Sequence, residues 1–350
     1  MSERQYELYA EKALAGECLS DAEGLNVLRA PDDALLDLLA AAFRVRRHYF
    51  GRRVLLHVLM NAKSGLCPED CGYCSQSSIS TAEIERYPLK SRGEMLTQAR
   101  QAAQAGAKRF CLVISGRGPT DREIESIADA VRAIKRELPL GICASLGLLT
   151  PEQAHALKSA GVDRINHNLN TSERFYPEIC STHSYGERLE TLATAQAAQL
   201  ERCCGLIAGQ GETEQDLIDV ARALRQLGPD SIPVNFLHPV KGTPLENVHD
   251  LTPTRCLNIL CLFRFYNPST EIRIAGGREY NLGPLQPLAL YPANAMFVNG
   301  YLTTTGQPAD EAIAMIRQMG FEIEPAGPPA LGEAVPRPHR ERDAELHLKP

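Results

Sequence analysis

Short runs of apolar and β-branched residues recur along the chain and alternate with longer segments of helical periodicity. Eight runs have the length and composition of buried β-strands, at residues 54–61, 109–115, 140–147, 163–170, 201–209, 231–239, 271–277 and 295–302. Segments between them, such as 121–138 and 151–161, carry apolar residues at helical spacing. Strands that alternate with helices in this way predict parallel βα units.

Eight such units are the number that closes a TIM-type (β/α)8 barrel, so an α/β barrel is the predicted fold. An open doubly wound sheet is the alternative. Residues 1–50 have helical patterns, including a capping-type Ser20-x-x-Glu23, and are predicted to form an N-terminal helical segment before a barrel over 51–322. Residues 323–350 are rich in proline and charge, which predicts a disordered C-terminal tail.

Composition places the chain among ordinary enzymes. Hydrophobic residues make up 44% and charged residues 23% of its 350 residues, and a net charge of −6 predicts neither nucleic acid nor a membrane as partner. The N-terminus lacks the apolar segment of a signal peptide, so we expect a cytoplasmic protein. Disulfides are rare in that reducing compartment, where clustered cysteines indicate metal or redox chemistry.

Three of the 11 cysteines follow the first predicted strand closely. Cys67, Cys71 and Cys74 have C-x3-C-x2-C spacing and are expected at the carboxyl end of the barrel strands, where TIM-type barrels carry their active sites. Structural zinc takes four protein ligands, and this loop offers no fourth cysteine or histidine. Catalytic zinc on three ligands is an alternative, but thiolates spaced this closely more often hold iron and sulfide. A 4Fe–4S cluster on three thiolates leaves one iron open for chemistry.

The barrel interior is predicted to be polar. Asn166, Asn168 and Asn170 alternate along the fourth strand and therefore share one face. If that face met the helices, three amides would be buried against apolar side chains at considerable cost. Arg273, between two isoleucines of the seventh strand, points inward by the same reasoning, and a buried guanidinium needs an anionic partner.

Three further cysteines fall in predicted strands: Cys111 in the second, Cys143 in the third and Cys203 in the fifth. Any one of them alone would be a small buried hydrophobe. Together with Arg273, they can converge only inside a barrel. Cys204 adjoins Cys203, and neighbours in a strand face opposite ways, so one of the two points toward the helices. The remaining residues of this kind are interpreted as structural, with the histidines on the face away from the interior: Cys18, Cys180, Cys256, Cys261, His57 and His167.

The spacing of the first three cysteines after the first strand of a parallel barrel resembles the radical S-adenosylmethionine superfamily. Tyr73 fits the aromatic position of its motif, and the segment GLIAGQGE is similar to a superfamily segment that lies along the adenine. The resemblance implies a 4Fe–4S cluster on Cys67, Cys71 and Cys74 whose open iron binds S-adenosylmethionine and cleaves it to methionine and a 5′-deoxyadenosyl radical. The residues it places near S-adenosylmethionine are Tyr73, Asn170, Gly205, Ile207, Gly209 and Glu212. Many relatives have aspartate at the position of Asn170.

The stretches CPEDCGYCSQ, NHNLNTS, IPVNFLHPVKGTPL and IRIAGGRE, with the second cysteine set, resemble the biotin synthase family over roughly residues 35–320. The resemblance implies insertion of sulfur into dethiobiotin, with the sulfur drawn from an auxiliary 2Fe–2S cluster. Its ligands would be Cys111, Cys143, Cys203 and Arg273, and the doubled cysteine at 203–204 leaves its nuclearity open. The implied substrate contacts are Asn168 and Asn235 to the ureido ring, and Thr303 and Thr304 to the carboxylate. A structural role for each of these four is the alternative.

The resemblance thus implies a sulfurtransferase in which the clusters, and no catalytic side chain, carry the radical chemistry. Its partners would be dethiobiotin, S-adenosylmethionine, an electron donor such as flavodoxin or ferredoxin, and a second copy in a homodimer. Two alternatives remain. A maturase of hydrogenase cofactors would share the first three cysteines but need not use Arg273. An iron–sulfur electron carrier or scaffold would need neither a polar interior nor an open iron.

Overall fold

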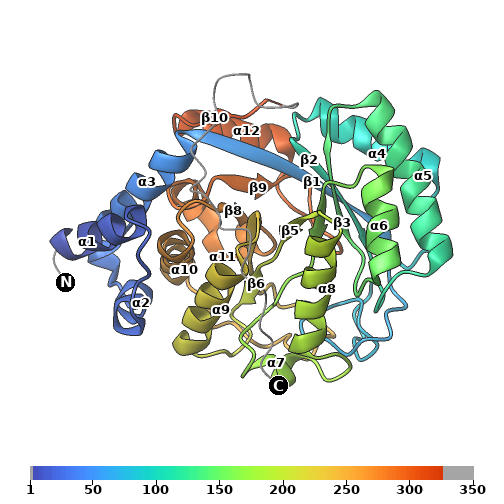
Figure 1. Ribbon diagram of the computed structural model, residues 1–350. Helices are drawn as coiled ribbons and strands as arrows, with labels where there is room; N and C mark the ends of the chain where they lie inside the picture. The colour runs from blue at the N-terminus through green and yellow to red at the C-terminus, as the bar shows by residue number, and fades with distance from the viewer. Residues whose placement is uncertain (1–2, 326–350) are drawn as a thin grey trace.

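The structure, a computed structural model, describes residues 3–325 and is centred on a barrel of parallel strands (Figure 1). These strands are β1 (Arg53–Lys63), β2 (Arg109–Ile114), β3 (Gly141–Ser145), β4 (Arg164–Asn166), β5 (Glu201–Cys203), β6 (Leu206–Ala208), β7 (Ser231–Phe236), β8 (Glu271–Ile274) and β9 (Ala295–Phe297). They lie in the order β1-β2-β3-β4-β5-β7-β8-β9, and β9 pairs with β1 and closes the sheet. The TIM-type barrel is confirmed, and the open sheet is wrong.

The predicted fifth strand is divided into β5 and β6, with Cys204 and Gly205 between them. β5 pairs with both β4 and β7, whereas β6 pairs with β7. A Cβ atom on Gly205 would lie 1.9 Å from the carbonyl oxygen of Pro233 in β7. The chain passes this close to β7 because residue 205 has no side chain.

Helices cover the outside of the barrel, as Figure 1 shows. They are α4 (Arg92–Gln104), α5 (Asp121–Glu137), α6 (Pro151–Ala160), α7 (Tyr176–Ile179), α8 (Tyr185–Ala197), α9 (Glu214–Leu227), α10 (Pro253–Tyr266), α11 (Arg278–Leu282) and α12 (Ala309–Gln318), with the 3-10 helix η2 (Gly283–Leu290). Capping boxes begin α4, α5, α6, α8 and α9, and they end the preceding loops at defined positions. The loops between strands and helices therefore have fixed ends.

The N-terminal helices α1 (Glu3–Leu14), α2 (Asp21–Leu28) and α3 (Leu35–Phe50) pack against α10 (Figure 1). A short 3-10 helix, η1 (Asp32–Ala34), precedes α3, and the expected Ser20–Glu23 pair is a capping box at the start of α2. The sequence did not predict α10, because it lies between these helices and the barrel and has no polar face to give a helical pattern. Cys256 and Cys261 are buried in it, in agreement with their structural interpretation.

The last described strand, β10 (Glu322–Ile323), pairs with the start of β1. It ends one residue after position 322, the predicted end of the barrel. Residues 326–350 of the predicted tail lie outside the described residues. Across residues 3–325, no helix is long and apolar enough to span a membrane.

The break at Gly205 can be tested by substitution. Gly205→Ala places a methyl group against the β7 backbone and should destabilise the protein by about 1–3 kcal/mol, as overpacking does. Gly186→Ala is the matched control, because its Cβ would meet nothing closer than 3.7 Å. Thermal unfolding of the iron-free proteins should show a lower midpoint for Gly205→Ala alone. Equal midpoints would contradict this account of the break.

Candidate active site

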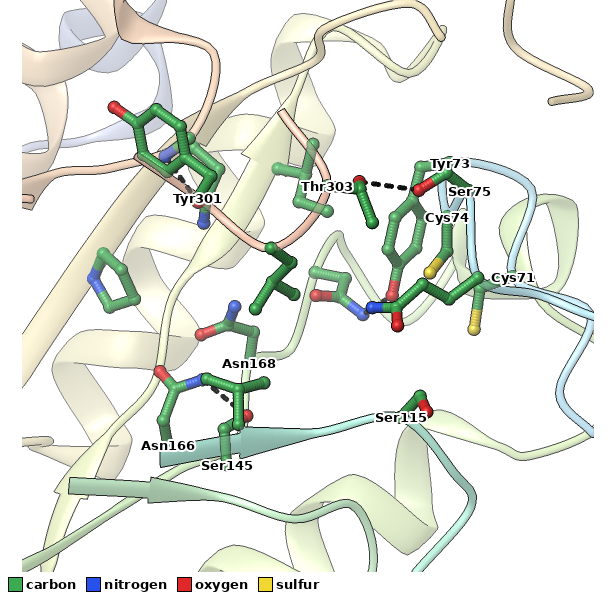
Figure 2. A pocket seen from close by; sticks show the side chains of 18 of the residues that line it. Cys71, Tyr73, Cys74, Ser75, Ser115, Ser145, Asn166, Asn168, Tyr301 and Thr303 are labelled. Atoms are coloured by element: carbon green, nitrogen blue, oxygen red, sulfur yellow. Dashed lines mark hydrogen bonds between the residues drawn. The ribbon is translucent and has the colours of Figure 1, made fainter. Parts of the chain in front are cut away.

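A cavity of about 390 Å³ lies at the carboxyl ends of the barrel strands. Figure 2 shows Cys71, Tyr73 and Cys74 on one side of it and Asn166 and Asn168 on another. Many of the residues singled out in the sequence line this cavity: Cys67, Cys71, Tyr73, Cys74, Cys111, Asn166, Asn168, Asn170, Ile207, Asn235, Arg273, Thr303 and Thr304. Cys143, Cys203, Gly205, Gly209 and Glu212 do not line it. The fold thus brings the three cysteines of the first set and Cys111 of the second set to one cavity.

The segment that follows α7 holds the loop that carries Cys67, Cys71 and Cys74. The carboxylate of Asp70 accepts hydrogen bonds from the backbone N–H groups of Ser181 and Thr182, at 3.0 and 3.2 Å. Glu69 is buried and accepts a hydrogen bond from the Thr182 hydroxyl at 2.7 Å. The two acidic residues between the cysteines therefore anchor the loop and leave the thiols to the cavity.

Cys180 is buried beside this loop, although no motif surrounds it. Its Sγ lies 3.7 Å from that of Cys71 and 3.2 Å from Nδ1 of His183. The three side chains are close enough to hold a metal ion together. However, Nδ1 of His183 also contacts Glu69, and Nε2 accepts a hydrogen bond from Arg188 at 2.7 Å. Both ring nitrogens thus already have partners. The contact between Cys180 and Cys71 crosses more than 100 residues, and no local pattern could have predicted it.

Three of the residues expected near S-adenosylmethionine, Tyr73, Asn170 and Ile207, lie together after the end of β4. The side-chain Nδ2 of Asn170 donates to the hydroxyl of Tyr73 at 2.7 Å, and its backbone oxygen accepts from the N–H of Ile207 at 2.9 Å. Asn170 has a φ of +69°, a left-handed conformation that asparagine adopts more readily than most residues. These bonds join the cysteine loop, β4 and β6 into one wall of the cavity.

Glu212 has a different place from the other members of this group. Its carboxylate accepts hydrogen bonds from the N–H groups of Gly209 and Gln210, at 2.6 and 2.7 Å. Burial raises the pKa of Glu212 above its ordinary value. Because both carboxylate oxygens hold the turn after β6, Glu212 shapes the loop and does not reach the cavity.

The four residues expected at the substrate differ in whether their side-chain polar atoms already have hydrogen-bond partners in the protein. Asn235 donates to the carbonyl of Leu206 and accepts from the N–H of Gly276, so its amide ties neighbouring strands together. Asn168 accepts from the N–H of Gly205 at 3.1 Å, and within residues 3–325 its Nδ2 has no hydrogen-bond partner. Thr303 is hydrogen-bonded to Ser75 of the cysteine loop at 2.8 Å (Figure 2), and Thr304 lines the cavity beside it.

Beneath the cavity, Cys111, Cys143 and Cys203 pack together with Ala275 and Phe297. Nη2 of Arg273 donates to Sγ of Cys203 at 2.8 Å. A hydrogen bond with Cys143, and then the charge of Arg273, lower the pKa of Cys111. Cys204 belongs to the other side, within the core between barrel and helices. Three buried thiols and a guanidinium therefore meet inside the barrel.

A charged layer lies directly below these thiols, two residues earlier in the strands. Glu271 precedes Arg273 in β8, Glu201 precedes Cys203 in β5, and Arg109 precedes Cys111 in β2. Positions i and i−2 of a strand share a face, so these side chains point to the same interior one layer lower. Period-two alternation in the strands could have predicted this layer, and the sequence analysis missed it.

Ion pairs connect the layer. Arg164 contacts Glu201 at 2.9 Å and Glu271 at 3.3 Å, and Arg109 also contacts Glu201 at 2.9 Å. The Glu201 side chain is 37% exposed, whereas the side chains of Arg164, Glu271 and Arg273 are at most 9% exposed. Taken together with Arg273 in the thiol layer above, the buried groups are two guanidinium groups, those of Arg164 and Arg273, and one carboxylate, that of Glu271, so their excess charge is positive.

His57 lies inside the barrel, and its predicted position on the outer face is wrong. Its Nδ1 lies 2.9 Å from Nη1 of Arg273, and its Nε2 lies 3.4 Å from Glu271. Burial lowers the pKa of His57 well below its ordinary value, which favours a neutral ring. The error arose because the polar partners of His57 lie on β8, far away in the sequence. His167 is also buried, and burial lowers its pKa in the same way.

Two family models match consecutive parts of this chain. The Radical SAM superfamily matches residues 63–224, and the Biotin and Thiamin Synthesis associated domain matches residues 233–322. A biotin synthase of Bacillus subtilis (strain 168) is 52% identical over 315 residues, which cover 90% of this chain and 94% of the relative. A biotin synthase of Geobacillus thermodenitrificans is 50% identical over 323 residues, 92% of this chain and 97% of the relative. The chain belongs to the biotin synthase family.

Solved structures with the same fold are more distant. Methylornithine synthase superposes with a TM-score of 0.80 at 22% identity, covering 90% of this chain and 97% of that one. The FeFe-hydrogenase maturase HydG of Carboxydothermus hydrogenoformans has a TM-score of 0.76 at 20% identity, covering 92% and 79%. At these identities the likeness shows the fold alone, whereas family membership rests on the relatives that are half identical. The alternatives of a maturase and of an electron carrier are therefore set aside.

Membership in the biotin synthase family makes this chain a radical S-adenosylmethionine enzyme and implies S-adenosylmethionine and a 4Fe–4S cluster as cofactors. The residues present fit that cluster, because the loop of Cys67, Cys71 and Cys74 borders the cavity with three thiols. Thiolates are the usual ligands of such clusters. The excess buried positive charge beside Cys111, Cys143 and Cys203 also suits an anionic group.

Proposed function

We propose that the chain converts dethiobiotin to biotin with sulfur drawn from an auxiliary iron–sulfur cluster inside the barrel. The observation that carries this proposal is the layer formed by Cys111, Cys143, Cys203 and Arg273 at the bottom of the cavity that the first cysteine set borders. A radical formed at the mouth of the cavity and a sulfide at its base would both reach a substrate held between them.

The first cluster is assigned to Cys67, Cys71 and Cys74. S-adenosylmethionine would lie along the wall that includes Tyr73, Asn170 and Ile207, while Gly205, Gly209 and Glu212 shape that wall from behind. The hydrogen bond between Asn170 and Tyr73 supports this assignment, because it holds the amide beside the cysteine loop. An amide at position 170 can still hydrogen-bond a ribose hydroxyl, without the charge of an aspartate.

Dethiobiotin is assigned to the space between the asparagines and the two threonines. Asn168 is the favoured contact for the ureido group, since its Nδ2 has no partner among residues 3–325. Asn235 could contact the same group only while it keeps its backbone bonds. Thr303 and Thr304 would take the carboxylate at the cavity wall, beside the cysteine loop.

The auxiliary cluster is assigned to Cys111, Cys143, Cys203 and Arg273, as a 2Fe–2S cluster. Cys204 faces the helices, so it is not a further ligand in this arrangement. Arg273 is 1% exposed and would balance part of the negative charge of the thiolates and sulfides. When bound, the cofactors supply a 5′-deoxyadenosyl radical, which removes hydrogen from unactivated carbon, and a sulfide, which the carbon radical attacks. Phe297, Leu59 and Tyr301 contribute apolar surface that keeps water from this region.

The reaction needs an electron from outside the chain. We therefore propose a small electron-transfer protein, such as flavodoxin or ferredoxin, as partner. A reducing cytoplasm would keep the 11 cysteines as free thiols, six of which are assigned to the clusters. A homodimer is the oligomeric state that the family resemblance predicts.

Single cysteine variants separate the two assignments. Cys67→Ala should lose both reductive cleavage of S-adenosylmethionine and biotin formation. Cys203→Ala should retain the cleavage, measured as 5′-deoxyadenosine, yet form no biotin. Cys204→Ala is the matched control, because it removes a buried thiol next to Cys203 on the opposite face, and it should retain both activities. Biotin formation by Cys203→Ala, or its loss from Cys204→Ala alone, would contradict the assigned ligands.

Arg273 variants test whether its charge serves a cluster. Arg273→Lys keeps the charge and should retain the auxiliary cluster with some turnover. Arg273→Met keeps most of the volume without the charge, so it should bind this cluster less firmly and shift its absorption. Anaerobic optical and Mössbauer spectra, compared with melting temperatures of the iron-free proteins, measure both effects. If both variants lost stability equally while the spectrum stayed unchanged, Arg273 would be a structural partner of Glu271 only.

A further inference from the structure

The guanidinium of Arg273 is held from several sides. Its Nη2 donates to Sγ of Cys203 at 2.8 Å, and its Nη1 lies 2.9 Å from Nδ1 of His57. Its Cζ lies 4.5 Å from the ring centroid of Phe297, and the His57 ring meets the same phenyl ring edge-on at 6.0 Å. Two partners and one aromatic face thus determine where the guanidinium points.

The orientation of His57 follows from hydrogen-bond chemistry. A guanidinium only donates, so Nδ1 of His57 must accept from Nη1. A neutral ring that accepts at Nδ1 carries its proton at Nε2, which faces the carboxylate of Glu271 at 3.4 Å. The ring is fully buried, so solvent offers it no other partner.

Glu271 is the competing partner for Arg273. Its Oε1 lies 3.6 Å from Nη1, too far for a good hydrogen bond. The hydroxyl of Ser231 donates to Oε1 at 2.6 Å, and Arg164 contacts both carboxylate oxygens at 3.3 Å. Without an acceptor at position 57, the unpaired Nη1 could turn toward this carboxylate and draw the guanidinium away from the thiols.

We propose that His57 is a positioning residue that aims Arg273 at the auxiliary cluster, by accepting the Nη1 hydrogen bond that Glu271 would otherwise receive. This inference rests on the proposed function, since it assumes a cluster on the Cys203 side of Arg273. It assigns His57 no contact with the substrate or with the reacting atoms. His57 would act only on the direction of the Arg273 guanidinium. Residues that hydrogen-bond to a metal ligand commonly orient that ligand in this way.

Two substitutions of similar size separate this role from a structural one. His57→Asn keeps an acceptor, because the amide oxygen can take the place of Nδ1. His57→Leu fills similar space with no acceptor. After anaerobic reconstitution, His57→Leu should show the shifted auxiliary-cluster absorption expected of Arg273→Met, and its iron content should fall toward that of one cluster. His57→Asn should keep the spectrum and iron content of the unsubstituted protein.

Two readouts distinguish positioning from folding. Leucine removes the bond between Nη1 of Arg273 and Nδ1 of His57, but Nη1 can then turn to Glu271, and Nε2 has no hydrogen-bond partner among residues 3–325 to lose; the melting temperature of the iron-free protein should therefore change little. Reductive cleavage of S-adenosylmethionine should also be unchanged in both variants. Identical spectra for His57→Leu and the unsubstituted protein would overturn the proposal. So would loss of the auxiliary cluster and of stability in both variants, which would give His57 a structural role. An unsubstituted protein without a second cluster would instead refute the proposed function.

Discussion

A guanidinium buried at the centre of a barrel needs a negative charge beside it, and this requirement organises the interior of the protein. Arg273 is 1% exposed, and the buried carboxylate beside it, that of Glu271, is already hydrogen-bonded to Ser231 and paired with Arg164. Burial alone lowers the pKa of Arg273, but the neighbouring sulfurs of Cys203 and Cys111 and the Glu271 carboxylate more than offset it. The three thiols are therefore where the remaining charge can be balanced, and an anionic iron–sulfur cluster would supply that balance.

The barrel turns this requirement into layers. Because side chains two residues apart share a face of a strand, a charged layer at the start of β2, β5 and β8 lies under a layer of thiols and Arg273. The cavity and the cysteine loop after β1 lie above both. In the proposed function, the lower layer would set the electrostatics, the middle layer would offer cluster ligands, and the upper space would admit substrate. The three roles are thus separated along the axis of the barrel.

Strand number, strand order and barrel closure could be predicted from the sequence, because alternating apolar runs and helical segments report them directly. The inward direction of Asn166 and Arg273 followed from period-two alternation. In contrast, α10 has no polar face, and the contact of Cys180 with Cys71 joins loops far apart in the sequence. His57 was placed on the wrong face, because its partners lie on another strand. Local patterns report which face is buried, whereas they do not report which buried polar groups meet.

The most direct test of this account is the position of iron in the protein. Anomalous X-ray diffraction from crystals reconstituted and grown anaerobically would locate each iron site. The account predicts one group of iron atoms at the loop of Cys67, Cys71 and Cys74. It predicts a second group within bonding distance of Cys111, Cys143, Cys203 and Arg273. A single iron site at the loop, with Nη2 of Arg273 still hydrogen-bonded to the Cys203 thiol, would contradict it.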